Sequence, residues 1–84
     1  MINTIQQLDL KVNKEGDGLW INYAPKTSRT IFDVCDLNGR VILTGQITDV
    51  ETSVSVAELY EDQYILLILD GDRVCSKKFQ IDRS

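Results

Sequence analysis

The chain has 84 residues, with nine Lys and Arg against thirteen Asp and Glu, no His, and a net charge of −4. This length fits one domain over residues 1–84, and an apolar fraction of 43% is enough for a folded core. The scattered cations argue against a nucleic-acid partner, and the missing His removes the commonest general base and metal ligand.

Short runs rich in β-branched and aromatic residues, separated by turn residues, predict strands along the whole chain. The expected strands are Ile5–Val12, Leu19–Ala24, Arg29–Leu37, Arg40–Ile47, Ser53–Val56, Gln63–Leu69 and Arg73–Ile81. Alternation within these segments directs one set of apolar side chains inward. That set is Leu8, Leu10, Val12, Leu19, Ile21, Tyr23, Phe32, Val34, Val54, Val56, Tyr64, Leu66, Ile68, Phe79 and Ile81. About seven short strands without a long helix predict an all-β fold, an immunoglobulin-like antiparallel β-sandwich.

The turn residues fix how these strands connect. Asn38-Gly39 is a pair that favours a tight type I′ hairpin, and Asp70-Gly71-Asp72 predicts a second hairpin. We expect a loop at Asp49–Thr52. One helical or 3₁₀ turn at Ala57–Asp62 is expected to place Leu59 in the core.

The two cysteines, Cys35 and Cys75, can form one disulfide or remain free. Cys35 and Phe32 have opposite parity along their strand, so an inward Phe32 predicts an outward Cys35 on an exposed face. Cys75 shares parity with Phe79 and is expected to face inward. Two thiols that point to different faces do not meet easily, which favours free thiols.

A hairpin pattern in the second half resembles that of a known family. The run Phe32-Asp33-Val34-Cys35-Asp36-Leu37-Asn38-Gly39-Arg40-Val41-Ile42 is similar to the hairpin of C-terminal sorting domains used in bacterial type IX secretion. Val54–Leu59, Tyr64–Leu66 and Lys77–Ile81 resemble later segments of that family, so the resemblance covers residues 18–81. The Pro-Asn-Pro opening of those domains is absent here, where the chain reads Asn13–Gly18, and Asp62 stands where they usually have Gly.

The resemblance implies a non-enzymatic, secretion-associated or cell-surface module that is recognised by a protein partner, either secretion machinery or a surface protein. The same pattern is similar to small secreted immunoglobulin-like proteins of unknown function from gut bacteria. That likeness implies a stand-alone binding protein, and carbohydrate is a candidate ligand. A small cytoplasmic adaptor is the third alternative.

Trp20 is the residue that a ligand would contact, because inward Leu19 and Ile21 predict that it faces outward. An exposed Trp beside Tyr23 or Tyr60 can stack on a sugar ring or anchor a partner. We favour the other interpretation, in which the N-terminal segment or the side chains of a neighbouring strand cover Trp20. We assign no catalytic, cofactor-binding or metal-binding residue, because no recognisable motif brings such groups together.

The chain ends and strand edges give the remaining expectations. Met1–Val12 lacks the basic start and continuous apolar run of a secretory signal, so we expect a cytoplasmic protein, or a secreted or surface protein whose leader was removed. No apolar run is long enough to span a membrane as a helix. The open edges of a small sandwich also permit a homodimer through added strands.

Overall fold

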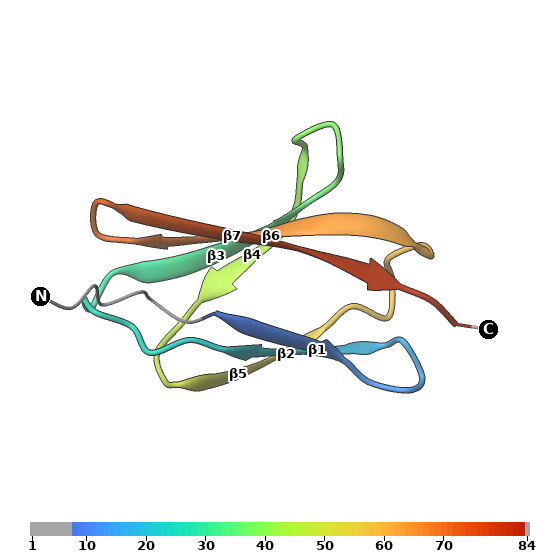
Figure 1. Ribbon diagram of the computed structural model, residues 1–84, viewed down its shortest axis with the longest axis horizontal. Coiled ribbons are helices and arrows are strands. Elements are labelled where there is room, and N and C mark those ends of the chain that lie inside the picture. Colours follow the sequence, from blue (N-terminus) through green and yellow to red (C-terminus); the bar gives the residue numbers. More distant parts are fainter. Residues whose placement is uncertain (1–7, 84) are drawn as a thin grey trace, which may run out of the picture.

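The chain folds into seven strands arranged as two antiparallel sheets that lie face to face (Figure 1). The computed structural model describes residues 8–83, and none of these forms a helix. The strands are β1 (Asp9–Val12), β2 (Gly18–Asn22), β3 (Thr30–Cys35), β4 (Val41–Gln46), β5 (Glu51–Ser55), β6 (Asp62–Asp70) and β7 (Arg73–Ile81). One sheet has the order β1-β2-β5 and the other β4-β3-β6-β7. The predicted all-β sandwich of about seven strands is therefore confirmed.

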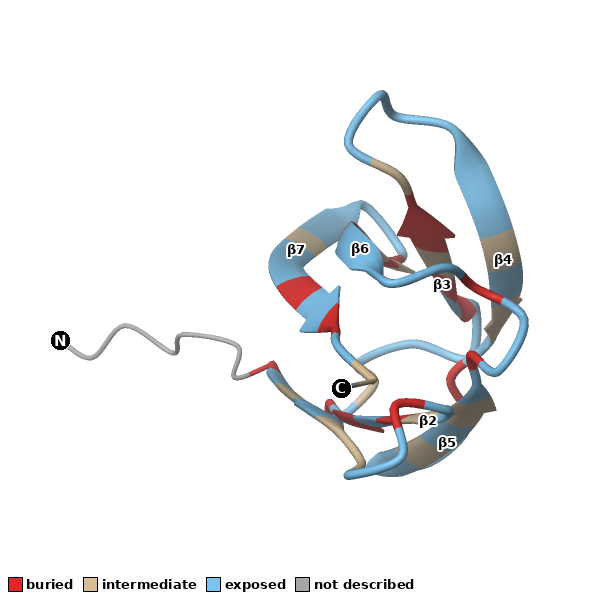
Figure 2. Cartoon of the chain, turned by 90° about the vertical axis from the view of Figure 1, so that its right-hand side faces the viewer, coloured by how far each residue is buried: buried red, intermediate tan, exposed pale blue. Residues whose placement is uncertain are grey.

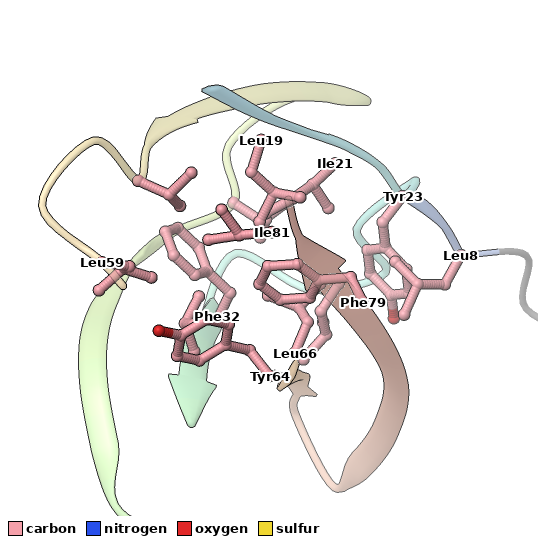
Figure 3. Packing of buried hydrophobic residues seen from close by; sticks show 14 residues of the cluster. Leu8, Leu19, Ile21, Tyr23, Phe32, Leu59, Tyr64, Leu66, Phe79 and Ile81 are labelled. Atoms are coloured by element: carbon pink, nitrogen blue, oxygen red, sulfur yellow. The ribbon is translucent and has the colours of Figure 1, made fainter. Parts of the chain in front are cut away.

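The core lies between the two sheets and is built from alternate residues of each strand, as the sequence predicts (Figure 3). Tyr64, Leu66 and Ile68 of β6 are buried, and the Tyr64 and Phe79 rings stack with centroids 5.7 Å apart. The buried core residues are Leu8, Leu19, Ile21, Tyr23, Phe32, Val34, Ile47, Val56, Leu59, Tyr64, Leu66, Ile68, Phe79 and Ile81. Leu10, Val12 and Val54 pack against this cluster from partly buried positions.

Two connections differ from the prediction. β5 begins at Glu51, so the loop expected over Asp49–Thr52 is shorter. The single helical or 3₁₀ turn expected over Ala57–Asp62 is a turn with one hydrogen bond of the 3₁₀ type that begins one residue earlier, because the Leu59 amide donates to the Val56 carbonyl at 3.0 Å. This turn still places Leu59 in the core, as expected. Ile5 to Gln7 of the first expected strand lie outside the described residues.

The corner between β5 and β6 is closed by a tyrosine. The Tyr64 hydroxyl donates a hydrogen bond to the Tyr60 carbonyl at 2.7 Å, which fixes the turn to the start of β6. Immunoglobulin-like sandwiches also have such a corner, but their constant-type domains place the fourth strand with the first, second and fifth. Here β4 instead lies beside β3. The immunoglobulin-like assignment within the sandwich class stays a prediction.

Candidate functional site

Trp20 lies in the middle of the β1-β2-β5 sheet and points outward, with 51% of its surface exposed. Its neighbours across the sheet are Lys11 on β1 and Ser53 on β5. Neither neighbour encloses the indole, so the expectation that a neighbouring strand covers Trp20 is wrong and half of its surface remains available for contact.

Tyr23 points to the opposite side of the chain and is only 1% exposed. Its hydroxyl donates to Asp70 at 2.7 Å, so the expectation that it forms a surface contact beside Trp20 is corrected: Tyr23 belongs to the interior. Tyr60 is 86% exposed and lies in the turn between β5 and β6. The structure thus leaves Trp20 and Tyr60 on the surface and removes Tyr23 from it.

Asp70 is the most heavily bonded side chain that sequence reasoning missed. It sits at the end of β6 and is 1% exposed. Its Oδ2 accepts from the Tyr23 hydroxyl and the Lys26 amide, both at 2.7 Å. Its Oδ1 accepts from the amide and hydroxyl of Thr27 at 3.0 and 2.9 Å and from the Thr30 hydroxyl at 2.8 Å. One carboxylate therefore anchors the whole β2–β3 connection to the β6–β7 hairpin.

These bonds decide the charge of the Asp70 carboxyl. Burial alone raises the pKa of Asp70, but the hydrogen bonds from Tyr23, Lys26, Thr30 and Thr27 outweigh burial and hold it well below its ordinary range. The same environment raises the pKa of Tyr23, first through burial and then through its bond to Asp70. A buried carboxylate whose oxygens are occupied by the protein's own donors has a structural role, because it offers no free position to a ligand.

The β6–β7 hairpin that follows Asp70 is tight, as predicted. Asp70 pairs with Arg73, so the loop consists of Gly71 and Asp72. Gly71 has φ of +64° and Asp72 has a negative φ, which matches the type II′ turn that places Gly first. This finding confirms the reading of these carboxylates as turn residues.

The β3–β4 hairpin forms as predicted, but its turn is of a different type. Type I′ requires positive φ at both Asn38 and Gly39, and only Gly39, at +87°, has it. The Asp36 carboxylate accepts from the amides of Asn38 and Arg40, both at 2.9 Å, and the Gly39 amide donates to the Asp36 carbonyl. These bonds favour a three-residue loop that ends in a left-handed Gly.

The hairpin loop stands clear of the two layers in Figure 1 and carries exposed apolar side chains. Leu37 and Val41 are each 52% exposed and Ile42 is 38% exposed. The pairing of β3 with β4 shifts between Val34 and Cys35, so Ile42 has no partner on β3. Three large apolar residues are thus presented together on a protruding element.

Both thiols are free, as predicted, and Cys75 packs against the core. Cys35 lies outside the core cluster, but the expectation of an exposed face is wrong: it is 3% exposed, in a strand flanked by β4 and β6. Burial raises the pKa of the Cys35 thiol, and the carboxylates of Asp33 and Asp36 add to that effect. A protonated, covered thiol is a poor nucleophile.

A small depression opens between β4 and the β5–β6 connection. It has a volume of about 140 Å³ and is lined by Leu43, Ser55, Val56, Glu58 and Leu59. Within residues 8–83, no three His, Cys, Asp or Glu side chains are grouped so that they could hold a metal ion. Over the same range, no helix is long and apolar enough to cross a membrane.

Comparison with known proteins adds no relative to this picture. No protein-family model matches the chain, and no curated protein matches its sequence.

Proposed function

We propose that this chain is a non-enzymatic module that binds a protein partner through the β3–β4 hairpin and the β4 strand. The observation that carries this proposal is the exposure of Leu37, Val41 and Ile42 on one protruding element. Large apolar residues that are exposed together are typical of protein interaction sites. The hairpin itself is held by the bonds of Asp36, so these side chains are presented on an ordered turn.

Site-specific photocrosslinking in the producing cell tests this proposal. A photoreactive residue at Leu37 or Val41 is expected to give a discrete protein adduct, whereas the same residue at the exposed control positions Glu15 and Asp72 is not. Adducts of equal yield at all four positions, or adducts only at the controls, would contradict the proposal.

The resemblance to type IX sorting domains supports a role for this module in secretion or at the cell surface. In this chain the shared residues build the turn: Asp36 accepts the loop amides, Gly39 takes the positive φ, and Arg40 pairs with Asp36 at 3.6 Å. A reporter with a leader peptide, expressed with and without this domain in a type IX-competent cell, tests the role. Export only with the domain is expected, and equal retention of both reporters contradicts it.

Carbohydrate binding is a second candidate, favoured by Trp20 alone. An indole exposed by half at the centre of a sheet can stack on a sugar ring. On a glycan array the unmodified chain is expected to bind at least one glycan, and Trp20→Ala to lose it while Lys78→Ala, on β7 of the other sheet, retains it. Binding that survives Trp20→Ala, or no binding by the unmodified chain, ends this alternative.

A further inference from the structure

β4 is an edge strand whose outer side can accept another strand. The Ile47 amide donates to the Thr30 carbonyl at 2.9 Å, and hydrogen-bonded pairs alternate along an antiparallel ladder. The intervening residues Thr44 and Gln46 therefore direct their amide and carbonyl groups away from β3. Both residues are exposed, and Figure 2 shows most of β4 in the colour of exposed residues.

The other edges of the two sheets are protected in ways that β4 is not. β7 carries Arg73, Lys77 and Lys78, and Lys77 also donates to the Leu8 carbonyl at 3.1 Å beside β1. β1 carries Asp9 and Lys11, and β5 begins with Glu51. Charged side chains on an edge discourage pairing with a further strand, and β4 has none between Val41 and Gln46. The open backbone of β4 is thus the most favourable place for strand addition.

The depression beside β4 supplies a pocket for one side chain of an added strand. Leu43 points toward the core side of its sheet and forms one wall, while Val56 and Leu59 form the other. Alternate side chains of a strand added to β4 would point to the same side. A volume of about 140 Å³ is close to the roughly 150 Å³ that holds a benzene molecule in an apolar cavity, so one apolar side chain fits.

The charges around the depression beside β4 indicate which residues would flank the apolar side chain of an added strand. Between residues 41 and 72 the chain has no Lys or Arg, although Arg83 reaches this side, where its guanidinium donates to the carbonyls of Val56 and Leu59. Asp49 and Glu51 follow β4, and Glu58 lines the pocket; all three are exposed. Basic residues on either side of an apolar anchor would complement these carboxylates.

From these observations we propose that β4 accepts an extended segment of a partner protein, with one apolar side chain in the pocket and Lys or Arg beside it. The segment extends the β4-β3-β6-β7 sheet by one strand, a common mode of peptide recognition. This inference rests on the proposed function and names its occupant. A second copy fits less well, because pairing two β4 strands about Thr44 sets Gly45 against Leu43, leaves the pocket empty and opposes two acidic surfaces.

The test uses a short capped peptide of alternating Thr and Leu with Lys at both ends, and a matched peptide with Glu at both ends. Binding to the full chain is measured by fluorescence anisotropy, and backbone amide exchange by NMR. The Lys peptide is expected to bind at least threefold more tightly than the Glu peptide, about the effect of exposed ion pairs. It is also expected to slow exchange of the Thr44 and Gln46 amides.

Two variants and one control identify the surface. Gln46→Pro removes an outward donor and is tolerated on an edge strand; it is expected to weaken binding at least tenfold. Glu58→Lys is expected to weaken the Lys peptide about threefold, whereas the control Glu15→Lys, which makes the same charge change elsewhere, leaves affinity unchanged. Circular dichroism and unchanged exchange in β6 show that the variants fold. If Gln46→Pro does not fold, Glu58→Lys and the amide exchange still decide the question.

The remaining outcomes separate the failure of this inference from that of the proposed function. If the Lys peptide does not bind while crosslinks still form specifically at Leu37 and Val41, the proposed strand addition is wrong. The proposed function as a protein-binding module is then still supported. If the Thr44 and Gln46 amides are protected from exchange without peptide, and this protection rises with protein concentration, then a second copy of the chain binds β4. That result overturns the proposal of a partner segment. Equal binding of the Lys and Glu peptides overturns the role of charge.

Discussion

Replacing Asp70 by Asn is expected to remove a large part of the stability of this fold. The carboxylate accepts five hydrogen bonds, three on Oδ1 and two on Oδ2. An amide keeps one oxygen, so at least the two bonds from Tyr23 and Lys26 are lost when the NH₂ group takes the Oδ2 position. At about 1.5–3 kcal/mol for each bond to a charged group, the loss of two bonds is about 3–6 kcal/mol.

This loss is large compared with the total. Domains have about 0.05–0.15 kcal/mol of stability per residue, which is about 4–13 kcal/mol for a chain of this size. With a urea slope of about 2 kcal/mol/M, the unfolding midpoint of Asp70→Asn is expected to fall by about 2 M at an unchanged slope. Asp72→Asn is the matched control, because Asp72 lies two residues further along the same hairpin and is exposed. Its unfolding midpoint is expected to be unchanged. If the two variants unfold at the same urea concentration, the reasoning about Asp70 is wrong.

The stability that Asp70 supplies also depends on pH in a defined direction. Its pKa in the folded chain lies well below the value of about 3.9 in an unfolded chain. Its contribution is therefore fully present above that unfolded value and is lost as the pH falls toward the folded value. The difference in unfolding free energy between the unmodified chain and Asp70→Asn should be constant near neutral pH and shrink below about pH 4. A difference that grows in acid would refute this assignment.

Three further substitutions test other contacts, each by urea unfolding. Gly45→Ala should destabilise the fold by about 1–3 kcal/mol, because its Cβ would lie 2.5 Å from the Phe32 ring; a neutral result would show that the ring moves freely. Tyr64→Phe removes the bond to the Tyr60 carbonyl and should cost about 1 kcal/mol, and a gain in stability would contradict the corner. Arg83→Met removes three bonds to backbone carbonyls and should cost about 1–3 kcal/mol, whereas an unchanged midpoint would show that the bonds are not formed in solution.

Alternation along the strands predicted the core well because it depends only on local geometry. From Tyr64 to Asp70 of β6 every second residue is buried, and Phe32 and Val34 of β3 alternate in the same way. The prediction of an exposed Cys35 was wrong because parity along a strand tells which face of the sheet a side chain occupies. It does not tell what covers that face. β3 is flanked by β4 and β6, and the neighbouring Ile65 is itself partly buried. Burial on the outer face of a central strand is a tertiary property.

The turn type and the Asp70 cluster were missed for a related reason. Asn38-Gly39 favours type I′ when the backbone alone decides, but here the Asp36 side chain binds two loop amides and selects another turn. Asp70 before Gly71 has the appearance of an ordinary turn residue. Its donors come from a segment that is forty or more residues away in the sequence and crosses the end of the sandwich. Only the pairing of β3 with β6 brings them together.

The distribution of the hydrogen bonds that join separate segments is consistent with the proposal that a partner binds on the β4 side. Asp70 joins the two sheets at one end, Arg83 joins three segments at the other, and Lys77 connects β7 to the start of β1. On the remaining side no hydrogen bond joins β4 to β5 among the described residues. A strand added there need not break an existing hydrogen bond, and it satisfies backbone groups that otherwise face water. Apart from Arg83, whose guanidinium donates to the carbonyls of the pocket residues Val56 and Leu59, these ties lie away from the surface proposed for a partner.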